Sequence, residues 1–220
     1  RQNINAWLKR PELGMIPLFM SGDKAFLYHA RQLRKEVGTE LVFFCAGNKL
    51  EKTQFKFGFS GIRDGENDQT LIRTKFKDQL QLISYYLKNF IINPAYLNDS
   101  IIDTAKAYFD TFLKKDDFLW LYHFIDWEEK NIVNTILKEY EWEISMDTKT
   151  TWRIGDGTAA FYNYIYQTVA GFTEDDDMLS NMVRTNYISR DEALKRSKEY
   201  SKPRAESIED YLQKVGLKNS

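Results

Sequence analysis

Two short apolar runs, joined by one amphipathic segment, constrain the fold of this chain more than any other feature. Residues 16–20 (IPLFM) and 41–45 (LVFFC) are bounded by turn signals, which is typical of buried strands. The segment between them has apolar residues at helical spacing: Phe26, Ala30, Leu33 and Val37. Gly38 suits the end of that helix. Because a strand-helix-strand unit places its two strands parallel and adjacent, the sequence predicts an α/β fold with a parallel sheet.

Polar residues directly follow the second predicted strand. They lie in the order Ala46-Gly47-Asn48-Lys49-Leu50-Glu51. In open α/β sheets, ligands bind beyond the carboxyl ends of the strands. Asn48 and Glu51 are therefore predicted ligand contacts, on topology alone. The polar loop at residues 62–67 predicts a boundary, which divides the chain into residues 1–65 and residues 66–220.

The second region has helical periodicity. Its apolar stripes comprise Phe76, Leu80, Ile83, Leu87 and Phe90, then Ile101, Ala105, Tyr108 and Phe112, and then Ile132, Val133, Ile136 and Tyr140. Pro94 is expected to end the first helix, and Ser100 to cap the second. Asp126 and Glu129 have the spacing of a capping box ahead of the third. We interpret the stripes as core, so this region is predicted to be mostly α-helical.

Residues 150–196 combine arginines, a Gly-Asp-Gly turn, an acidic run and an aromatic segment. Gly155 and Gly157 can adopt positive φ, so Asp156 between them can be held out from the backbone at little steric cost. A carboxylate in such a turn suits a metal ion, a hydroxyl group or an arginine. Residues 158–169 are apolar on nearly every side, which predicts a buried helix. Asp156 is therefore expected at the mouth of a buried region.

Ser189 and Glu192 have the spacing of a further capping box, in which each side chain binds a backbone amide of the first helical turn. Arg190 lies in the same turn, where a cation opposes the helix dipole. An anionic ligand would account for this arginine. Solvent exposure alone would also keep the cost of the arrangement low, so both interpretations stay open.

The charge balance and the cysteine content disfavour several classes of function. The chain has 31 basic and 32 acidic residues, a formal net charge of −1, which disfavours general binding to nucleic acid or a membrane surface. The single cysteine, Cys45, excludes an intrachain disulfide and a cysteine-based zinc site. Without a secretory signal or a bilayer-length apolar run, a cytoplasmic protein is expected. The chain begins at Arg1, which suggests a fragment of a longer polypeptide.

Four segments, in their order along the chain, resemble a known enzyme family. They are residues 14–33 (GMIPLFMSGDKAFLYHARQL), 41–51 (LVFFCAGNKLE), 124–137 (FIDWEEKNIVNTIL) and 150–194, which contains TTWRIGDGTAAFYNYIY and GFTEDDDMLSNMVRTNYISRDEAL. Together they resemble the N-acetyl sugar amidotransferase family of the PP-loop ATP pyrophosphatases, known from surface-polysaccharide biosynthesis. The resemblance covers nearly the whole chain.

The resemblance implies a parallel-sheet nucleotide-binding region of the adenine nucleotide α-hydrolase type, followed by a helical substrate region. It implies ATP and Mg²⁺ as cofactors and a sugar or nucleotide-sugar as substrate. In the family's chemistry, a carbonyl oxygen of a sugar-linked N-acetyl or carboxyl group is activated as an adenylate, with release of pyrophosphate. Ammonia from a separate glutaminase subunit then displaces AMP. Such chemistry needs cations that stabilise the leaving pyrophosphate.

The family's motifs also imply catalytic residues. Arg153 and Asp156 match the motif that should face the activated group. Arg184 and Arg190 match late arginines that would clamp phosphate as bidentate forks. These four residues form the predicted catalytic set.

The cofactor-binding residues implied by the resemblance follow the second predicted strand. Gly47 and Glu51 match the family's strand-end motif near the nucleotide and the metal, and Asn48 lies beside them. The family's defining Ser-Gly-Gly-x-Asp-Ser phosphate loop does not occur in this sequence. We therefore expect the chain to be an incomplete portion of an enzyme, inactive toward ATP by itself.

Two other functions remain open from the sequence. One is another PP-loop chemistry, such as sulfur transfer to a nucleobase, although a near-neutral chain without a catalytic cysteine pair disfavours it. The other is a non-catalytic module that binds a sugar or a protein and kept the fold. Aromatic surface in the helical region makes a homodimer a further expectation.

Overall fold

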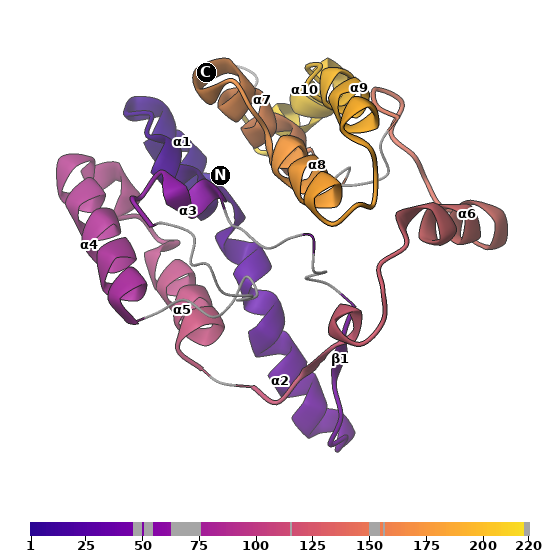
Figure 1. Ribbon diagram of the computed structural model, residues 1–220. Coiled ribbons are helices and arrows are strands. Elements are labelled where there is room, and N and C mark those ends of the chain that lie inside the picture. Colours follow the sequence, from indigo (N-terminus) through magenta and orange to yellow (C-terminus); the bar gives the residue numbers. More distant parts are fainter. Residues whose placement is uncertain are drawn as a thin grey trace. The chain divides into compact units, whose positions relative to one another are not determined.

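The computed structural model describes residues 1–45, 50, 55–62, 76–114, 116–149, 155 and 157–217 (Figure 1). The chain divides into two compact units, Arg1–Ile125 (unit 1) and Asp126–Ser220 (unit 2). Of the residues that the structure describes, 67% are helical. The boundary predicted between residues 65 and 66 lies outside the described residues.

Helices make up most of both units. Unit 1 contains α1 (Gln2–Lys9), the 3₁₀ helix η1 (Leu13–Ala25), α2 (Phe26–Val37), β1 (Phe43–Phe44), α3 (Phe55–Gly58), α4 (Phe76–Ile92), η2 (Pro94–Tyr96), α5 (Ile101–Phe112), β2 (Leu119–Trp120) and η3 (Leu121–His123). Unit 2 contains α6 (Glu129–Glu139), α7 (Thr158–Ala170), α8 (Glu174–Arg184), α9 (Arg190–Tyr200) and α10 (Ala205–Lys214).

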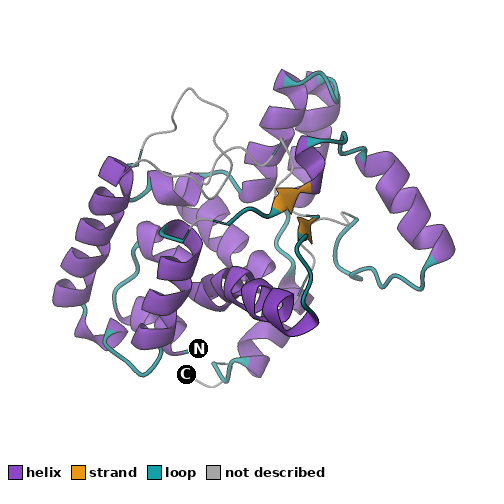
Figure 2. Ribbon diagram, turned by 90° about the horizontal axis from the view of Figure 1, so that it is seen from below, coloured by secondary structure: helices purple, strands orange, loops and turns teal. Residues whose placement is uncertain are grey.

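The predicted parallel-sheet nucleotide-binding core is wrong. Residues 16–20, expected as a strand, lie within the 3₁₀ helix η1. In the part of the chain that the structure describes, the strands are β1 and β2, which pair in parallel with Phe43 opposite Leu119 and Phe44 opposite Trp120 (Figure 2). The run at residues 41–45 thus holds a short strand, but its partner comes from much later in the chain. No sheet of the PP-loop type is evident among these residues.

The packing of residues 16–20 explains why they form a helix. An apolar run of this length fits a buried strand or a buried helix equally well by periodicity. Pro17 lacks the amide that a central strand donates to its neighbour. The run is part of η1, which packs against α1, α3 and α5, and its Ile16 and Leu18 are buried. The helix therefore buries the same side chains without needing strand partners.

Buried asparagines fasten α1 to its neighbours. Asn3 Nδ2 donates to the carbonyl of Leu18 at 3.0 Å, and Asn93 Nδ2 donates to the carbonyl of Ala6 at 2.7 Å. Both asparagines are buried. A buried side-chain amide without a hydrogen-bond partner would lose the full free energy of its hydration. These two hydrogen bonds therefore fix the position of α1 more firmly than exposed ones would.

The helix predicted over residues 26–37 is confirmed as α2, which ends at Gly38 with a φ of 71°. Its predicted apolar stripe, however, does not form core. Leu33 and Val37 are 57% and 74% exposed, whereas Leu27 is buried. The buried side of α2 instead carries Leu27 and, one turn later, Arg31. Arg31 binds carboxylates of the segment between α5 and β2.

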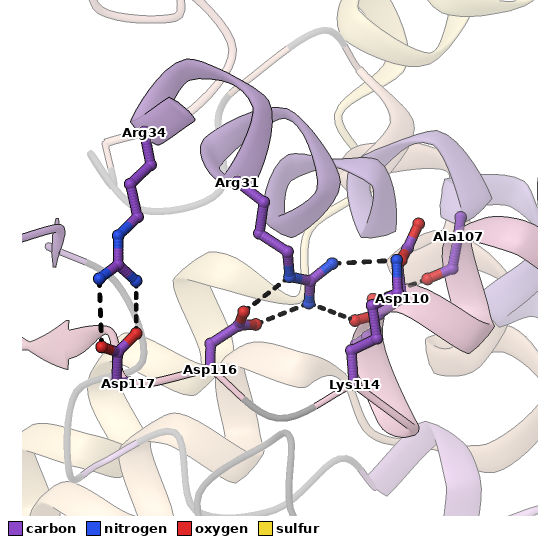
Figure 3. Close-up of polar contacts among 8 residues, drawn as sticks. Arg31, Arg34, Ala107, Asp110, Lys114, Asp116 and Asp117 are labelled. Carbon is purple, nitrogen blue, oxygen red and sulfur yellow. Dashed lines mark hydrogen bonds and ion pairs between the residues drawn. The ribbon is translucent and has the colours of Figure 1, made fainter. Parts of the chain in front are cut away.

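Two arginines of α2 bind the segment that leads into β2 (Figure 3). Arg31 donates from Nε and Nη2 to the two carboxylate oxygens of Asp116, both at 2.6 Å, and from Nη1 to Asp110 Oδ1 at 3.2 Å. Arg34 donates to the two oxygens of Asp117 at 2.5 and 3.2 Å. These bidentate pairs position the chain for the pairing of β1 with β2.

The later helices lie where the sequence predicts them, but the interpretation of their apolar stripes as core is wrong for two of them. Leu80, Ile83 and Leu87 of α4 are about half exposed, and α6 has no buried residue. The first predicted helix is α4, which ends at Ile92 just before Pro94.

Ser100 directly precedes α5, but the predicted cap is wrong, because the Ser100 hydroxyl donates to Asn98 Oδ1 at 2.6 Å and binds no amide of the helix. Residues 158–169 lie within α7. The capping box predicted from Asp126 and Glu129 is wrong, because Glu129 is the first residue of α6 instead of its third.

The core of unit 2 forms between α7 and α10. Phe161, Tyr162 and Tyr166 of α7 are buried, as is Tyr211 of α10. The rings of Phe161 and Tyr211 lie 5.7 Å apart between centroids. This aromatic contact joins α7 to α10.

Candidate functional site

The structure describes two of the seven predicted site residues. Gly47, Asn48, Glu51, Arg153 and Asp156 lie outside the described residues, so their roles stay predictions. The other two predicted residues are described. Arg184 is the last residue of α8, and Arg190 is the first residue of α9. Both lie beside one short turn, which is the candidate site.

A capping box fixes the start of α8. Thr173 Oγ1 accepts a hydrogen bond from the amide of Asp176 at 3.4 Å, and Asp176 Oδ2 accepts one from the amide of Thr173 at 2.8 Å. Acidic residues fill the first turn of α8, where they complement the helix dipole. The Thr-x-x-Asp spacing was the sequence signal for this cap, and it was missed. The acidic run at residues 174–177 is thereby explained structurally.

Asn186 shapes the turn between α8 and α9. Its φ of 58° is in the left-handed region, which asparagine adopts more readily than most residues. The amide of Asn186 donates to the carbonyl of Val183 at 3.1 Å, and the amide of Tyr187 donates to that of Met182 at 2.8 Å. This is a Schellman motif, which ends α8 in one defined conformation.

Arg184 is exposed beside this turn, and a hydrogen bond to a buried side-chain amide orients it. Its Nη1 donates to Asn181 Oδ1 at 2.8 Å, and Asn181 is only 5% exposed. Among the described residues, no acceptor binds its Nε or Nη2. The guanidinium is therefore oriented and still has donors available for a ligand.

Arg190 is exposed at the other side of the turn. Ser189 caps α9 as predicted, because Ser189 Oγ accepts a hydrogen bond from the amide of Glu192 at 3.2 Å. The second arm of the predicted capping box is wrong, since the Glu192 carboxylate accepts from Arg196 Nε at 2.8 Å. That hydrogen bond lowers the pKa of Glu192. Within the described ranges, neither an ion pair nor a hydrogen bond neutralises Arg190.

Residues of the turn and of α9 also bind the segment that leads into α6. The hydroxyl of Tyr187 donates to the carbonyl of Trp127, and Arg196 Nη1 lies 3.0 Å from Glu129 Oε2. Burial, followed by the charges of Asp126 and Glu128, raises the pKa of Tyr187. Sequence reasoning missed Tyr187 and Arg196. Only the four-residue spacing of Glu192 and Arg196 signalled part of this cluster.

A second polar cluster joins residues 145–147 to the start of α10. Asp147 Oδ1 accepts from Ser145 Oγ at 2.6 Å and from Arg204 Nε at 3.2 Å, and Asp147 Oδ2 accepts from the amide of Ser207 at 3.0 Å. Burial alone would raise the pKa of Asp147, but the hydrogen bonds from Ser145, Ser207 and Arg204 outweigh it and lower the pKa. Asp147 therefore caps α10 from a distant position in the chain.

A polar cavity of about 30 Å³ lies beside this cluster, lined by residues that include Asn163, Thr173, Asp175 and Arg204. That volume holds about one water molecule, so the cavity is too small for a substrate. No three His, Cys, Asp or Glu side chains gather as metal ligands anywhere in the described ranges. Within the same ranges, every helix is too short or too polar to cross a bilayer.

The chain was also compared with known proteins. No family model, no curated protein and no solved structure matches it.

Proposed function

We propose that this chain is part of an ATP-dependent amidotransferase that acts on a sugar or nucleotide-sugar, in which the α8–α9 turn binds phosphate oxygens. The observation that carries the proposal is the placement of Arg184 and Arg190. Both are exposed, and they flank one turn of defined conformation. Two exposed guanidiniums on either side of one turn offer donors that an anionic ligand can use.

The two arginines would have different tasks. Arg184, held at one nitrogen by Asn181, can offer its remaining donors to two oxygens of a phosphate as a fork. Arg190 adds a second cation at a helix start, where backbone amides also favour an anion. Together they would stabilise the charge that develops on a pyrophosphate as it leaves.

The proposed reaction follows the family that the sequence resembles. A carbonyl oxygen of the sugar-linked group attacks the α-phosphorus of ATP, and pyrophosphate leaves. Ammonia from a separate glutaminase then displaces AMP and forms the new carbon–nitrogen bond. The chemistry would take place in the cytoplasm, where ATP is available. Arg184 and Arg190 would bind phosphates of ATP, whereas no group of three His, Cys, Asp or Glu side chains among the described residues forms a metal site.

Calorimetric titration with pyrophosphate tests the proposal directly. Arg184→Gln and Arg190→Gln should each weaken binding by about tenfold, because each removes a charge-assisted hydrogen bond. Lys198→Gln is the matched control, since Lys198 is also exposed on α9 and lies away from the turn. Equal affinities for all three variants would remove the α8–α9 turn as the phosphate site.

A second candidate function is a non-catalytic module that binds a sugar or a protein. The observation that favours it is the helical architecture, without a parallel-sheet core among the described residues. This candidate predicts no affinity for pyrophosphate, and its sugar-binding form predicts binding of a probe sugar such as N-acetylglucosamine. The same calorimetric experiment, run with both ligands, separates the two functions.

A further inference from the structure

Residues 130–144, termed the arm, form an excursion from unit 2 that is held at both ends by polar contacts. The arm consists of most of α6 and the extended chain after it. Not one of its residues is buried. Figures 1 and 2 both show α6 set apart from the bundle of α7 to α10.

The first anchor of the arm is on the α8–α9 turn and on α9. The Tyr187 hydroxyl binds the carbonyl of Trp127, and Arg196 pairs with Glu129 at 3.0 Å. Arg196 Nε also pairs with Glu192 Oε1 of α9 at 2.8 Å. The guanidinium therefore has a fixed position on α9 while it binds Glu129 at the start of α6. Two side chains therefore hold the start of the arm.

The second anchor is on α10. Ser145 and Asp147, which follow the arm, bind Arg204 and Ser207. The side chains of Asp147 and Arg204 are only 12% and 11% exposed, so this end is well packed. Between the anchors, apolar side chains such as Tyr140, Trp142 and Ile144 are 65%, 49% and 58% exposed.

This arrangement has an energetic consequence. Elements with few buried apolar contacts open locally at low free energy, while the rest of the fold stays intact. We propose that the arm unfolds locally as one unit about its two anchors, a motion here called the hinge, and that Tyr187 and Arg196 oppose this opening. Because Tyr187 lies between Arg184 and Arg190, an anion that orders the turn also steadies the arm. This coupling rests on the proposed function, whereas the hinge does not.

Amide hydrogen exchange of the whole chain, followed by mass spectrometry, tests the hinge without any ligand. Amides of α6 should exchange faster than those of α7 and α8. Tyr187→Phe and Arg196→Gln should each speed exchange in α6 by about fivefold, the factor expected for loss of one hydrogen bond, and should leave α7 unchanged. Tyr164→Phe and Lys198→Gln are the controls, because both residues are exposed on neighbouring helices and take no part in the anchors.

Two results would overturn the hinge. One is exchange in α6 as slow as in α7, and the other is an unchanged rate in both anchor variants. Added pyrophosphate tests the coupling separately, and it should slow exchange in α6 of the wild-type chain. Pyrophosphate that binds without this effect overturns the coupling. Pyrophosphate that does not bind overturns the proposed function, while the ligand-free rates still decide the hinge.

Discussion

Arg31 binds Asp116 through two parallel hydrogen bonds of 2.6 Å each, and the same guanidinium reaches Asp110, whose side chain is 2% exposed. The hydrogen bond to Asp116 is the main reason that the pKa of Arg31 is raised. Arg31 is thus charged at every accessible pH. One side chain therefore holds α2, the end of α5 and the entry to β2 together.

Removing this guanidinium should destabilise unit 1 strongly. Arg31→Met removes a positive charge that offsets the cost of burying the Asp110 carboxylate. The free energy of unfolding should therefore fall by about 3 kcal/mol. Urea unfolding followed by circular dichroism measures the loss. Arg34→Met is the matched control and should cost clearly less, because the Asp117 side chain is 72% exposed. Equal losses would show that burial does not decide the strength of these pairs.

The Asp147 cluster should make unit 2 sensitive to acid. The pKa of Asp147 in the folded state lies below its ordinary value of 3.8. Its contribution to stability is therefore fully present above that value and is lost as the pH falls below it. The melting temperature of wild-type unit 2 should decline as the pH is lowered from 5 to 3, and Asp147→Asn should be less stable at pH 7 and less sensitive to pH. A parallel decline in the variant would assign the acid sensitivity to other groups.

The second glycine of the Gly-Asp-Gly turn should not tolerate a side chain. Gly157 has a φ of 88°, and a Cβ there would lie 2.5 Å from the carbonyl oxygen of Ser207 in α10. Gly171 has a similar φ of 77° but has open space around it. Gly171→Ala should cost about 1 kcal/mol from backbone strain alone, and Gly157→Ala should cost more because α10 must also move. Thermal unfolding of the two variants compares them, and equal shifts would rule out the steric contribution.

Features that depend on neighbouring residues were predicted well from the sequence. The end of α2 follows from Gly38, and the cap of α9 follows from Ser189. In each case the deciding interaction spans a few residues, so local rules suffice. The turn that brings Arg184 and Arg190 together was not predicted, because only the position of Arg190 in a first helical turn follows from the sequence.

Features that depend on distant residues were not predicted. The run at residues 16–20 is apolar in any conformation, and only its packing against α5 decides that it is a 3₁₀ helix. The partner of β1 is β2, and the partner of Arg196 is Glu129, both from far along the chain. Periodicity within a segment carries no information about such pairings. The sequence therefore predicted a sheet that these residues do not form.

The contact between Arg31 and Asp116 also bears on the order of folding. Their 85-residue separation means that a large loop must close before the pair can form, and the entropy of closure grows with loop length. The two-residue strands β1 and β2 are too short to close that loop by their own hydrogen bonds. The helices of unit 1 should consequently dock first, and the miniature sheet should assemble last, as a late event in the kinetics of folding.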